Sequence, residues 1–193
     1  MKVALIGKGH VGSAIAKGLT SKGHEVKFGH RNPKEPVFEA AKWGEIIFLA
    51  VPFDSISEAV KKIGSAADGK PVVDVTNVID QEGDLAIGFS TSGAEELQKK
   101  MPKAFVVKAF NTVFASNQSN GRINSEQLTL FVAGDQAKAK DVVMRLGRDI
   151  GFEPVDAGPL KNARYLEPMA MLIIDLGYGL GMGTNIGYRL VKG

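Results

Sequence analysis

The stretch VALIGKGHVG, residues 3–12, decides the fold of this chain. Its first four residues form a short apolar run that is typical of a buried strand, and the motif G-x-G-x-x-G follows at once. Val11, Ile15 and Leu19 then recur at four-residue spacing, which predicts one face of a helix. A strand, a glycine turn and a helix in this order are typical of a βαβ unit that binds the pyrophosphate of a dinucleotide.

Each glycine of the motif has its own expected task. Gly7 allows the tight turn, Gly9 lets the backbone approach the pyrophosphate, and Gly12 lets the helix and the strand pack closely. The free N–H groups and the positive dipole end at the start of the helix favour phosphate. Lys8 and His10 occupy the variable positions, where either residue lies beside the phosphates or faces the nicotinamide.

The end of the second predicted strand indicates which dinucleotide is bound. Enzymes that bind NAD place an Asp or Glu here to accept hydrogen bonds from the ribose hydroxyls. This chain has Gly29 at that position, followed by His30 and Arg31. A guanidinium can pair with a 2′-phosphate in bidentate fashion. The residues that complete this predicted cofactor-binding stretch are Asn32 and Lys34. The sequence therefore predicts NADP rather than NAD.

Strands and helices alternate along the rest of the chain. Strands are expected at residues 3–6, 25–29, 46–51, 72–75, 104–110, 128–133 and 153–156, and helices at 11–23, 37–43, 55–63, 93–101, 137–150 and from 160 onward. This alternation predicts an α/β, Rossmann-like fold with a doubly wound, mainly parallel sheet. We expect a single NADP-binding domain over residues 1–193, with 159–193 as a C-terminal helical extension.

The region after the second strand is unusually short. Only fourteen residues separate Arg31 from Ile46, where a usual dinucleotide-binding fold places a helix, a strand and a second helix. There is room for one short helix, so a helix and an edge strand are expected to be missing from that half of the sheet.

The ends of the third and fourth predicted strands add candidate cofactor contacts. Ala50, Val51 and Pro52 close the third strand, and small residues there leave room for the ribose and the nicotinamide. Thr76 and Asn77 end the fourth strand. They are expected to face the same crevice, at the point where the strand order of such a sheet reverses.

Composition and charge exclude several classes of function. A net charge of +3 is too weak a bias to indicate nucleic acid, but it suits an anionic small ligand. The absence of cysteine excludes a disulfide framework, a thiolate zinc site and a cysteine nucleophile. We find no metal-binding cluster, no Ser-His-Asp set and no carboxylate pair, and we therefore name no catalytic acid or base. Hydride transfer between two rings needs alignment more than acid–base catalysis.

The apolar segments do not indicate a membrane protein. The N-terminus reaches its glycines before the apolar core of a signal peptide could form. The apolar stretch 168–183 is too short to span a bilayer, and it contains Asp175 and four glycines. We expect a cytoplasmic protein with no membrane segment.

Six stretches spread over nearly the whole chain carry a further signal: VALIGKGHVGSAIAKGL, KFGHRNP, IIFLAVP, VVDVTN, VVKAFNT and VDAGPLKNARYLEPM. Together they resemble the family of F420-dependent NADP oxidoreductases, whose members pass hydride between NADP(H) and a 5-deazaflavin. The last stretch, residues 155–169, is the more specific signal, because the glycine motif is shared by many unrelated dehydrogenases. VVKAFNT also resembles the reductase domain of the six-transmembrane ferric and cupric reductases, which use NADPH and a flavin.

The resemblance implies roles for individual residues. Lys8 to Val11 would line the pyrophosphate, His30 and Arg31 would hold the 2′-phosphate, and Ala50 to Pro52 with Thr76 and Asn77 would flank the nicotinamide ribose. The acceptor, coenzyme F420 or a flavin, would lie against the nicotinamide near Asn111, Thr112 and the segment 181–183. This chain departs from archaeal members in having Lys8 where they usually carry a small hydroxyl residue, and in its short segment after the second strand.

The sequence leaves the reaction and the assembly open. A reductase of a small C=N or C=O substrate would need a proton donor, for which Tyr165 and Lys8 are candidates, and a third possibility is an NADP(H)-binding sensor without turnover. Arg164 either binds an acidic tail on a cofactor or pairs with Glu167, which is otherwise expected on a helix surface or at an interface. The apolar run 169–188 packs on its own sheet or against a second subunit, and we favour a homodimer.

Overall fold

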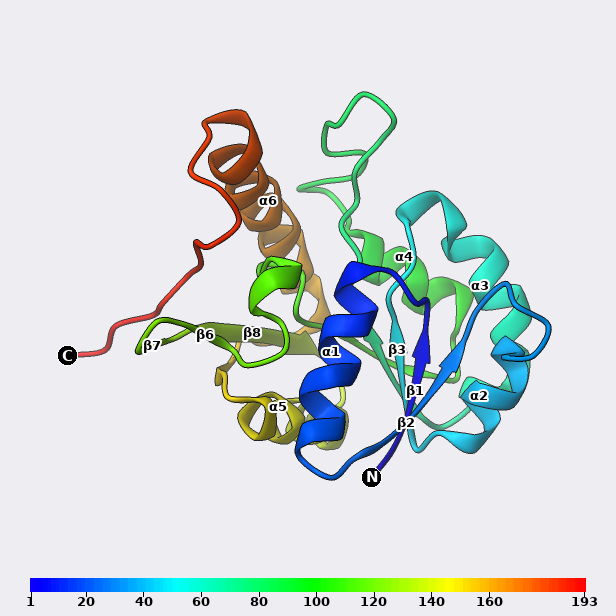
Figure 1. Cartoon of the computed structure of the whole chain (residues 1–193). Coiled ribbons are helices and arrows are strands. Elements are labelled where there is room, and N and C mark those ends of the chain that lie inside the picture. The colour runs from blue at the N-terminus through cyan, green and yellow to red at the C-terminus, as the bar shows by residue number, and fades with distance from the viewer.

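A seven-stranded sheet forms the centre of the fold in the computed structural model, which describes all residues from 1 to 193 (Figure 1). The strands of this sheet are β1 (Lys2–Ile6), β2 (Glu25–Gly29), β3 (Ile46–Leu49), β4 (Pro71–Asp74), β5 (Phe105–Lys108), β8 (Thr129–Gly134) and β9 (Glu153–Asp156). Their order is β2-β1-β3-β4-β5-β8-β9, and every neighbouring pair is parallel except β5 and β8. The predicted mainly parallel, Rossmann-like sheet is confirmed.

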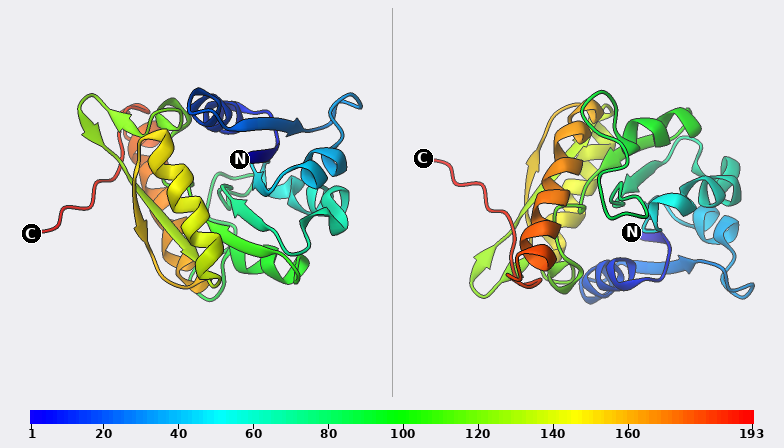
Figure 2. Two further views of the ribbon diagram at one scale, coloured as in Figure 1. Left: turned by 90° about the horizontal axis from the view of Figure 1, so that it is seen from below. Right: turned by 90° about the horizontal axis from the view of Figure 1, so that it is seen from above.

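Helices cover both faces of the sheet (Figure 2). One face carries α1 (His10–Ser21) and α5 (Ala137–Ile150), and the other carries α2 (Val37–Trp43), α3 (Ile56–Ile63) and α4 (Gly93–Lys100). Along β1, Val3 and Leu5 pack toward α1 while Ala4 and Ile6 pack toward α2. Each central strand is therefore buried on both sides, which explains why its sequence is a continuous apolar run.

The connection from β2 to β3 contains a single helix, α2, and β2 is the edge strand of the sheet. The expected absence of a further helix and strand is thus confirmed. A Cβ atom at Gly29 would lie 2.9 Å from the Cα atom of Val37, so α2 packs directly against the end of β2. Because of this close packing, the single short helix α2 is enough to cover its face of the sheet at the β2 edge.

The C-terminal extension is only partly helical. The helix α6 (Ala163–Ile174) ends in a short π-helical turn, Asp175–Gly179, and the chain beyond it is irregular. The expectation of helix to the end of the chain is therefore wrong. Gly181 and Gly183 both adopt positive φ, of 71° and 75°, and glycines in this run favour turns over a continued helix.

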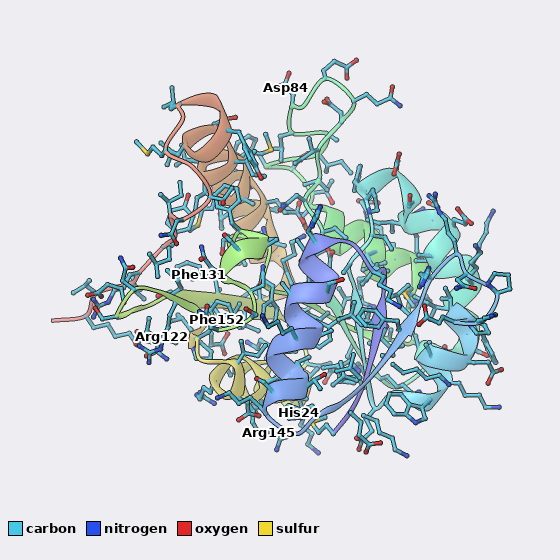
Figure 3. All side chains as sticks on the ribbon, viewed as in Figure 1. His24, Asp84, Arg122, Phe131, Arg145 and Phe152 are labelled. Carbon is cyan, nitrogen blue, oxygen red and sulfur yellow. The ribbon has the colours of Figure 1, made fainter.

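Two irregular features lie outside the main sheet. A small hairpin of β6 (Arg122–Ile123) and β7 (Glu126–Gln127) precedes β8. The long connection from β4 to α4 stands away from the domain beside α6, with Asp84 near its tip (Figure 3). His24 lies at the opposite end of the molecule, where its Nε2 is 3.1 Å from the Asp149 carboxylate.

No helix in the chain has the length and apolar character needed to cross a membrane.

Candidate functional site

Two adjoining pockets open at the carboxyl ends of the first four strands. The pocket toward β2 has a volume of about 490 Å³, and the pocket toward β4 has a volume of about 730 Å³. They share a wall made of Gly9, Ala50, Val51 and Pro52. In open α/β sheets a ligand binds at this edge, where the strand order reverses. The two pockets therefore offer the space in which an extended dinucleotide would lie.

The glycine turn between β1 and α1 forms the floor that joins the pockets. Gly7 has φ of 107°, and a Cβ atom there would lie 2.1 Å from the carbonyl oxygen of Ala50. A Cβ atom at Gly12 would lie 2.5 Å from the carbonyl oxygen of Gly7 and 2.7 Å from the Leu5 side chain. Gly9, in contrast, has no neighbour within 4 Å of the position its Cβ would take. Gly7 and Gly12 are thus required by packing, and Gly9 faces open space.

The start of α1 is well suited to an anion. Gly9 is its N-cap residue, and no side chain caps the helix. The N–H groups of a first helical turn have no partner within the helix, and they lie at the positive end of the helix dipole. Both features favour binding of a phosphate. Lys8, Gly9, His10 and Val11 all line one of the pockets or both, as the predicted pyrophosphate contacts require.

The pocket beside β2 is rich in basic side chains. Lys8, His30, Arg31 and Lys62 line it, together with Glu58. Lys62 Nζ lies 2.6 Å from Glu58 Oε1, and its hydrogen bond lowers the pKa of Glu58 below the usual value. Arg31 is exposed and takes part in no ion pair of the chain.

The loop after β2 brings an unexpected carboxylate to this pocket. Lys8 Nζ lies 3.1 Å from Glu35 Oε1 and 3.2 Å from Oε2, and His30 Nε2 pairs with the same carboxylate. The hydrogen bond from Lys8 lowers the pKa of Glu35, so this group stays ionised at neutral pH. Asn32 and Lys34 do not line the pocket. The Asn32 side chain instead accepts a hydrogen bond from the Lys34 backbone N–H at 3.0 Å, which stabilises the loop.

The larger pocket is bounded by the ends of β3 and β4 and by the loop that follows β4. Thr76 and Asn77 line it, as predicted, together with Ile79 and Ala86 of that loop. The Oδ1 atom of Asn77 is buried and has no hydrogen-bond partner within the chain. An unpartnered buried acceptor in a pocket wall is costly unless a ligand supplies the donor.

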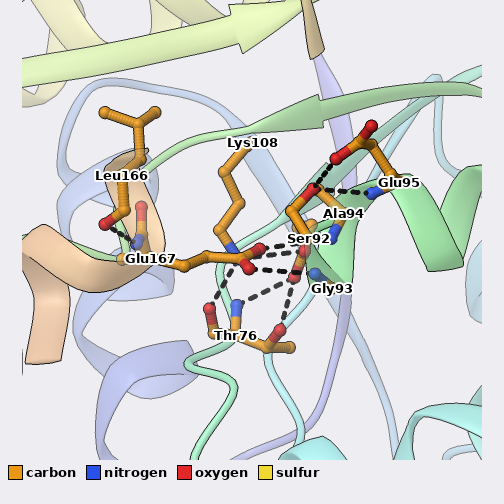
Figure 4. A network of polar contacts seen from close by, with 10 residues as sticks. Thr76, Ser92, Gly93, Ala94, Glu95, Lys108, Leu166 and Glu167 are labelled. Atoms are coloured by element: carbon orange, nitrogen blue, oxygen red, sulfur yellow. Dashed lines mark hydrogen bonds and ion pairs between the residues drawn. The ribbon is translucent and has the colours of Figure 1, made fainter. Parts of the chain in front are cut away.

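A buried ion triad lies behind this wall (Figure 4). Lys108 Nζ is 3.0 Å from Asp74 Oδ2, 3.1 Å from Glu167 Oε1 and 2.7 Å from the Thr76 carbonyl oxygen that it donates to. All three charged side chains are fully buried. Burial alone would lower the pKa of Lys108, but the charges of Asp74 and Glu167 outweigh it and raise that pKa, so the amine stays protonated.

The triad joins the pocket wall to two helices. Asp74 Oδ1 accepts from the Thr76 backbone N–H at 2.9 Å and from its hydroxyl at 2.7 Å. Glu167 accepts from the N–H groups of Gly93 at 2.9 Å and Ala94 at 3.2 Å, at the N-terminus of α4. The expectation that Glu167 lies on a helix surface is therefore wrong. The glutamate is buried because the start of α4 and the Lys108 amine both hold its charge.

The residues predicted to meet the acceptor lie deeper than expected. Asn111 and Thr112 are buried and line neither pocket, and Asn111 Nδ2 donates to the Leu166 carbonyl oxygen at 2.8 Å. Arg164 makes two hydrogen bonds of 2.8 Å to the Glu95 carboxylate, so it does not pair with Glu167. Around Asn111 and Arg164, the polar side chains thus hold α6 in place.

Sequence reasoning missed Glu35, Glu58, Lys62, Asp74 and Lys108, and it named Glu167 without its place in the triad. One signal was available for Lys108, which ends an apolar strand at a position buried on both sides. No group of three or more His, Asp or Glu side chains in the chain could hold a metal ion. The larger pocket contains no lysine, tyrosine or cysteine, and its ionisable lining residues are His10, Asp54, Asp80 and Glu82. Its shape and its place at the carboxyl ends of the strands are suited to binding a dinucleotide.

Comparison with known proteins agrees with this geometry. The sequence model of the family described as NADP oxidoreductase coenzyme F420-dependent matches residues 2–42 and 35–78. The chain is 28% identical to the F420-dependent NADP reductase of Methanothermobacter marburgensis, over 100% of this chain and 99% of that protein. It is 33% identical to the metalloreductase STEAP3 of Rattus norvegicus, over 90% of this chain.

The chain spans only 37% of the length of the metalloreductases that it matches. Among solved structures, a putative F420-dependent NADP reductase from Arthrobacter sp. FB24 has a TM-score of 0.91 and 29% identity, with 100% of both chains covered. An imine reductase from Myxococcus stipitatus has a TM-score of 0.69 at 18% identity and shows the shared fold alone. The predicted resemblance to NADP-dependent oxidoreductases is confirmed.

Proposed function

We propose that this chain, which is similar to the coenzyme F420-dependent NADP oxidoreductases, is an oxidoreductase that moves hydride between NADP(H) and a deazaflavin or flavin. The observation that carries NADP is the end of β2. Gly29 stands where an acid would bind the ribose of NAD, and the unpaired Arg31 follows at the pocket. A guanidinium there is the group that recognises a 2′-phosphate.

The residues of the two pockets fit this cofactor. The uncapped N-terminus of α1 would hold the pyrophosphate over Gly9, and Arg31 with His30 would hold the 2′-phosphate. Thr76 and the unpartnered Asn77 Oδ1 would receive hydrogen bonds from the ribose hydroxyls or the carboxamide of the nicotinamide half. When bound, the nicotinamide supplies the hydride chemistry, and the chain holds and aligns it.

A flavin-like acceptor is favoured over a small C=N or C=O substrate because of the proton that such a substrate needs. Of the two candidate donors, Tyr165 lines neither pocket, and Lys8 lies in the pocket beside β2 and is bonded to Glu35. His10 does line the larger pocket, so the imine in the experiment below also tests whether its imidazole acts as a donor. Transfer between two ring systems needs no such donor if the rings are aligned. The name of one relative, an F420-dependent NADP reductase, points to a deazaflavin, whereas the metalloreductase is named for a metal, which the ferric chelate in the experiment below tests.

Oxidation of NADPH, followed at the absorbance of its reduced ring, tests this proposal. The purified chain is mixed with NADPH and, separately, with coenzyme F420, FMN, FAD, a ferric chelate and a cyclic imine. We expect turnover with the deazaflavin or a flavin and none with the imine. Binding of NADPH without turnover on any acceptor would favour the sensor, and turnover on the imine alone would favour the small-substrate reductase.

We further propose that the chain forms a homodimer through α6 and the turn that follows it. Leu172, Tyr178 and Leu180 are all more than half exposed, at 54%, 67% and 72%. Large apolar side chains gathered on one segment are typical of an interface. Size-exclusion chromatography with light scattering, at micromolar concentration, should give twice the chain mass, and a monomer would refute the dimer.

The cytoplasm is the compartment we propose, because NADPH and deazaflavins are soluble cofactors.

A further inference from the structure

Most basic side chains of the pocket beside β2 are already paired with carboxylates of the chain itself. Lys62 is paired with Glu58, and both Lys8 and His30 contact the carboxylate of Glu35. Arg31 is the cationic residue of this pocket without an ion pair. A phosphate that arrives here therefore meets one unpaired basic group and must compete with Glu35 or Glu58 for the three others.

The backbone fixes Glu35 in this position. The loop from residue 30 to residue 35 closes on itself, since the His30 N–H donates to the Glu35 carbonyl oxygen at 3.0 Å. The Glu35 N–H donates in turn to the Asn32 carbonyl oxygen at 2.9 Å. The short β2–β3 connection thus returns the Glu35 side chain to the pocket rim, where a third of it remains exposed, at 32%.

The Lys8 side chain is held from a second side as well. Its Nζ lies 5.0 Å from the centre of the Phe28 ring, within the range of a cation–π contact. Lys8 thus lies between an aromatic face and a carboxylate, and its charge is compensated before any ligand binds. The Glu35 carboxylate occupies the place beside Lys8 and His30 that an anionic ligand group would otherwise take.

We propose that Glu35 is a specificity-determining residue, an internal anion that holds Lys8 and His30 and that the 2′-phosphate of NADPH must displace. This inference rests on the proposed NADP function of the same pocket. A 2′-phosphate carries negative charge and competes with Glu35, whereas the 2′-hydroxyl of NADH is neutral and does not compete. The pyrophosphate is common to both nucleotides, so any competition between it and Glu35 for Lys8 affects both alike. Glu35 therefore lowers the affinity for NADPH more than the affinity for NADH.

The test compares Glu35→Gln with Glu39→Gln as a matched control. Glu39 is an exposed glutamate in the first turn of α2, and it forms no ion pair, so its variant removes the same charge nearby without freeing a cation. Dissociation constants for NADPH and NADH are measured by calorimetric titration of the whole chain. Melting temperatures of both variants check that the fold is intact.

We expect Glu35→Gln to bind NADPH roughly two- to fivefold more tightly, because the free energy of an exposed ion pair corresponds to a change of this size in the dissociation constant. The affinity for NADH and both affinities of Glu39→Gln should change less than the NADPH affinity of Glu35→Gln. Weaker NADPH binding by Glu35→Gln, or an equal change for both nucleotides, would overturn the inference. Weaker NADH binding would show that Glu35 instead accepts from a ribose hydroxyl.

This experiment distinguishes failure of the proposed function from failure of the role of Glu35. A wild-type chain that binds neither nucleotide refutes the proposed function and this inference with it. A wild-type chain that binds NADPH, together with a Glu35→Gln variant that binds it no more tightly, refutes only the role of Glu35.

Discussion

Replacement of Gly9 by valine separates the binding role of the glycine turn from its structural role. Gly9 adopts φ of −78° and ψ of −172°, an extended conformation that valine accepts without strain. Its absent Cβ has no neighbour within 4 Å, so the free protein has room for the new side chain. We therefore expect Gly9→Val to fold.

The expected magnitudes follow from this geometry. Valine is a poorer N-cap than glycine, which costs about 1 kcal/mol of stability, or about 2–4 °C in melting temperature for a chain of this size. The same side chain occupies the space over the helix N-terminus where the pyrophosphate would lie. Loss of two hydrogen bonds to a charged group, at about 1.5–3 kcal/mol each, weakens binding of both NADPH and NADH at least about a hundredfold.

Calorimetric titration with both nucleotides and a thermal melt measure the two quantities in one preparation. Gly179→Val is the control, since Gly179 also has open space at its Cβ position but lies outside both pockets. Gly12→Ala gives the opposite case, because its Cβ would meet the Gly7 carbonyl oxygen at 2.5 Å and disturb the fold itself. An unchanged dissociation constant for Gly9→Val would refute the assignment of the phosphate site.

Three further substitutions test other parts of the site. Arg31→Ala should weaken binding of NADPH by about 1.5–3 kcal/mol and leave that of NADH almost unchanged in the same titration, and an equal loss for both would contradict the 2′-phosphate assignment. Lys108→Met should lower the free energy of unfolding in urea by about 3–5 kcal/mol, because it leaves two buried carboxylates without their cation, and a loss below about 1 kcal/mol would contradict this. The hydrogen bond from Arg164 depresses the pKa of Glu95 below 4.5, so this pair contributes stability above that pH and loses it as the pH falls through the depressed value. Glu95→Gln should therefore flatten the acid side of a stability–pH curve, and curves that run parallel to the wild type would count against it.

Local patterns predicted the parts of the fold that local physics controls. The bounds of β2, α2, α5 and β9 match those expected from the sequence, where the short length between Arg31 and Ile46 set those of α2. The roles of Gly7 and Gly12 were also predictable, because a tight turn and a close helix crossing leave no space for a side chain. The apolar spacing after residue 179 misled the prediction, since it said nothing about the backbone freedom of the glycines that interrupt it.

The polar partners of the site could not be predicted in the same way. Lys8 and Glu35 are 27 residues apart, and Lys108 and Asp74 are 34 residues apart. Only the folded sheet brings them together, because neither pair shares a helix face or a strand. A lysine at the end of a strand buried on both sides does indicate a buried counter-ion, but the sequence does not identify which carboxylate supplies it.

The buried triad also sets which hydrogen bonds the larger pocket can offer. The Thr76 hydroxyl donates to Asp74, and its carbonyl oxygen already accepts from Lys108. Toward the pocket, that hydroxyl is therefore left as an acceptor, and the neighbouring Asn77 Oδ1 is an acceptor without a donor. A wall of this kind suits the amide and hydroxyl donors of a nicotinamide riboside. Because Glu167 ties this arrangement to α6, a shift of that helix would move Lys108 and with it the wall against which the reacting ring is aligned.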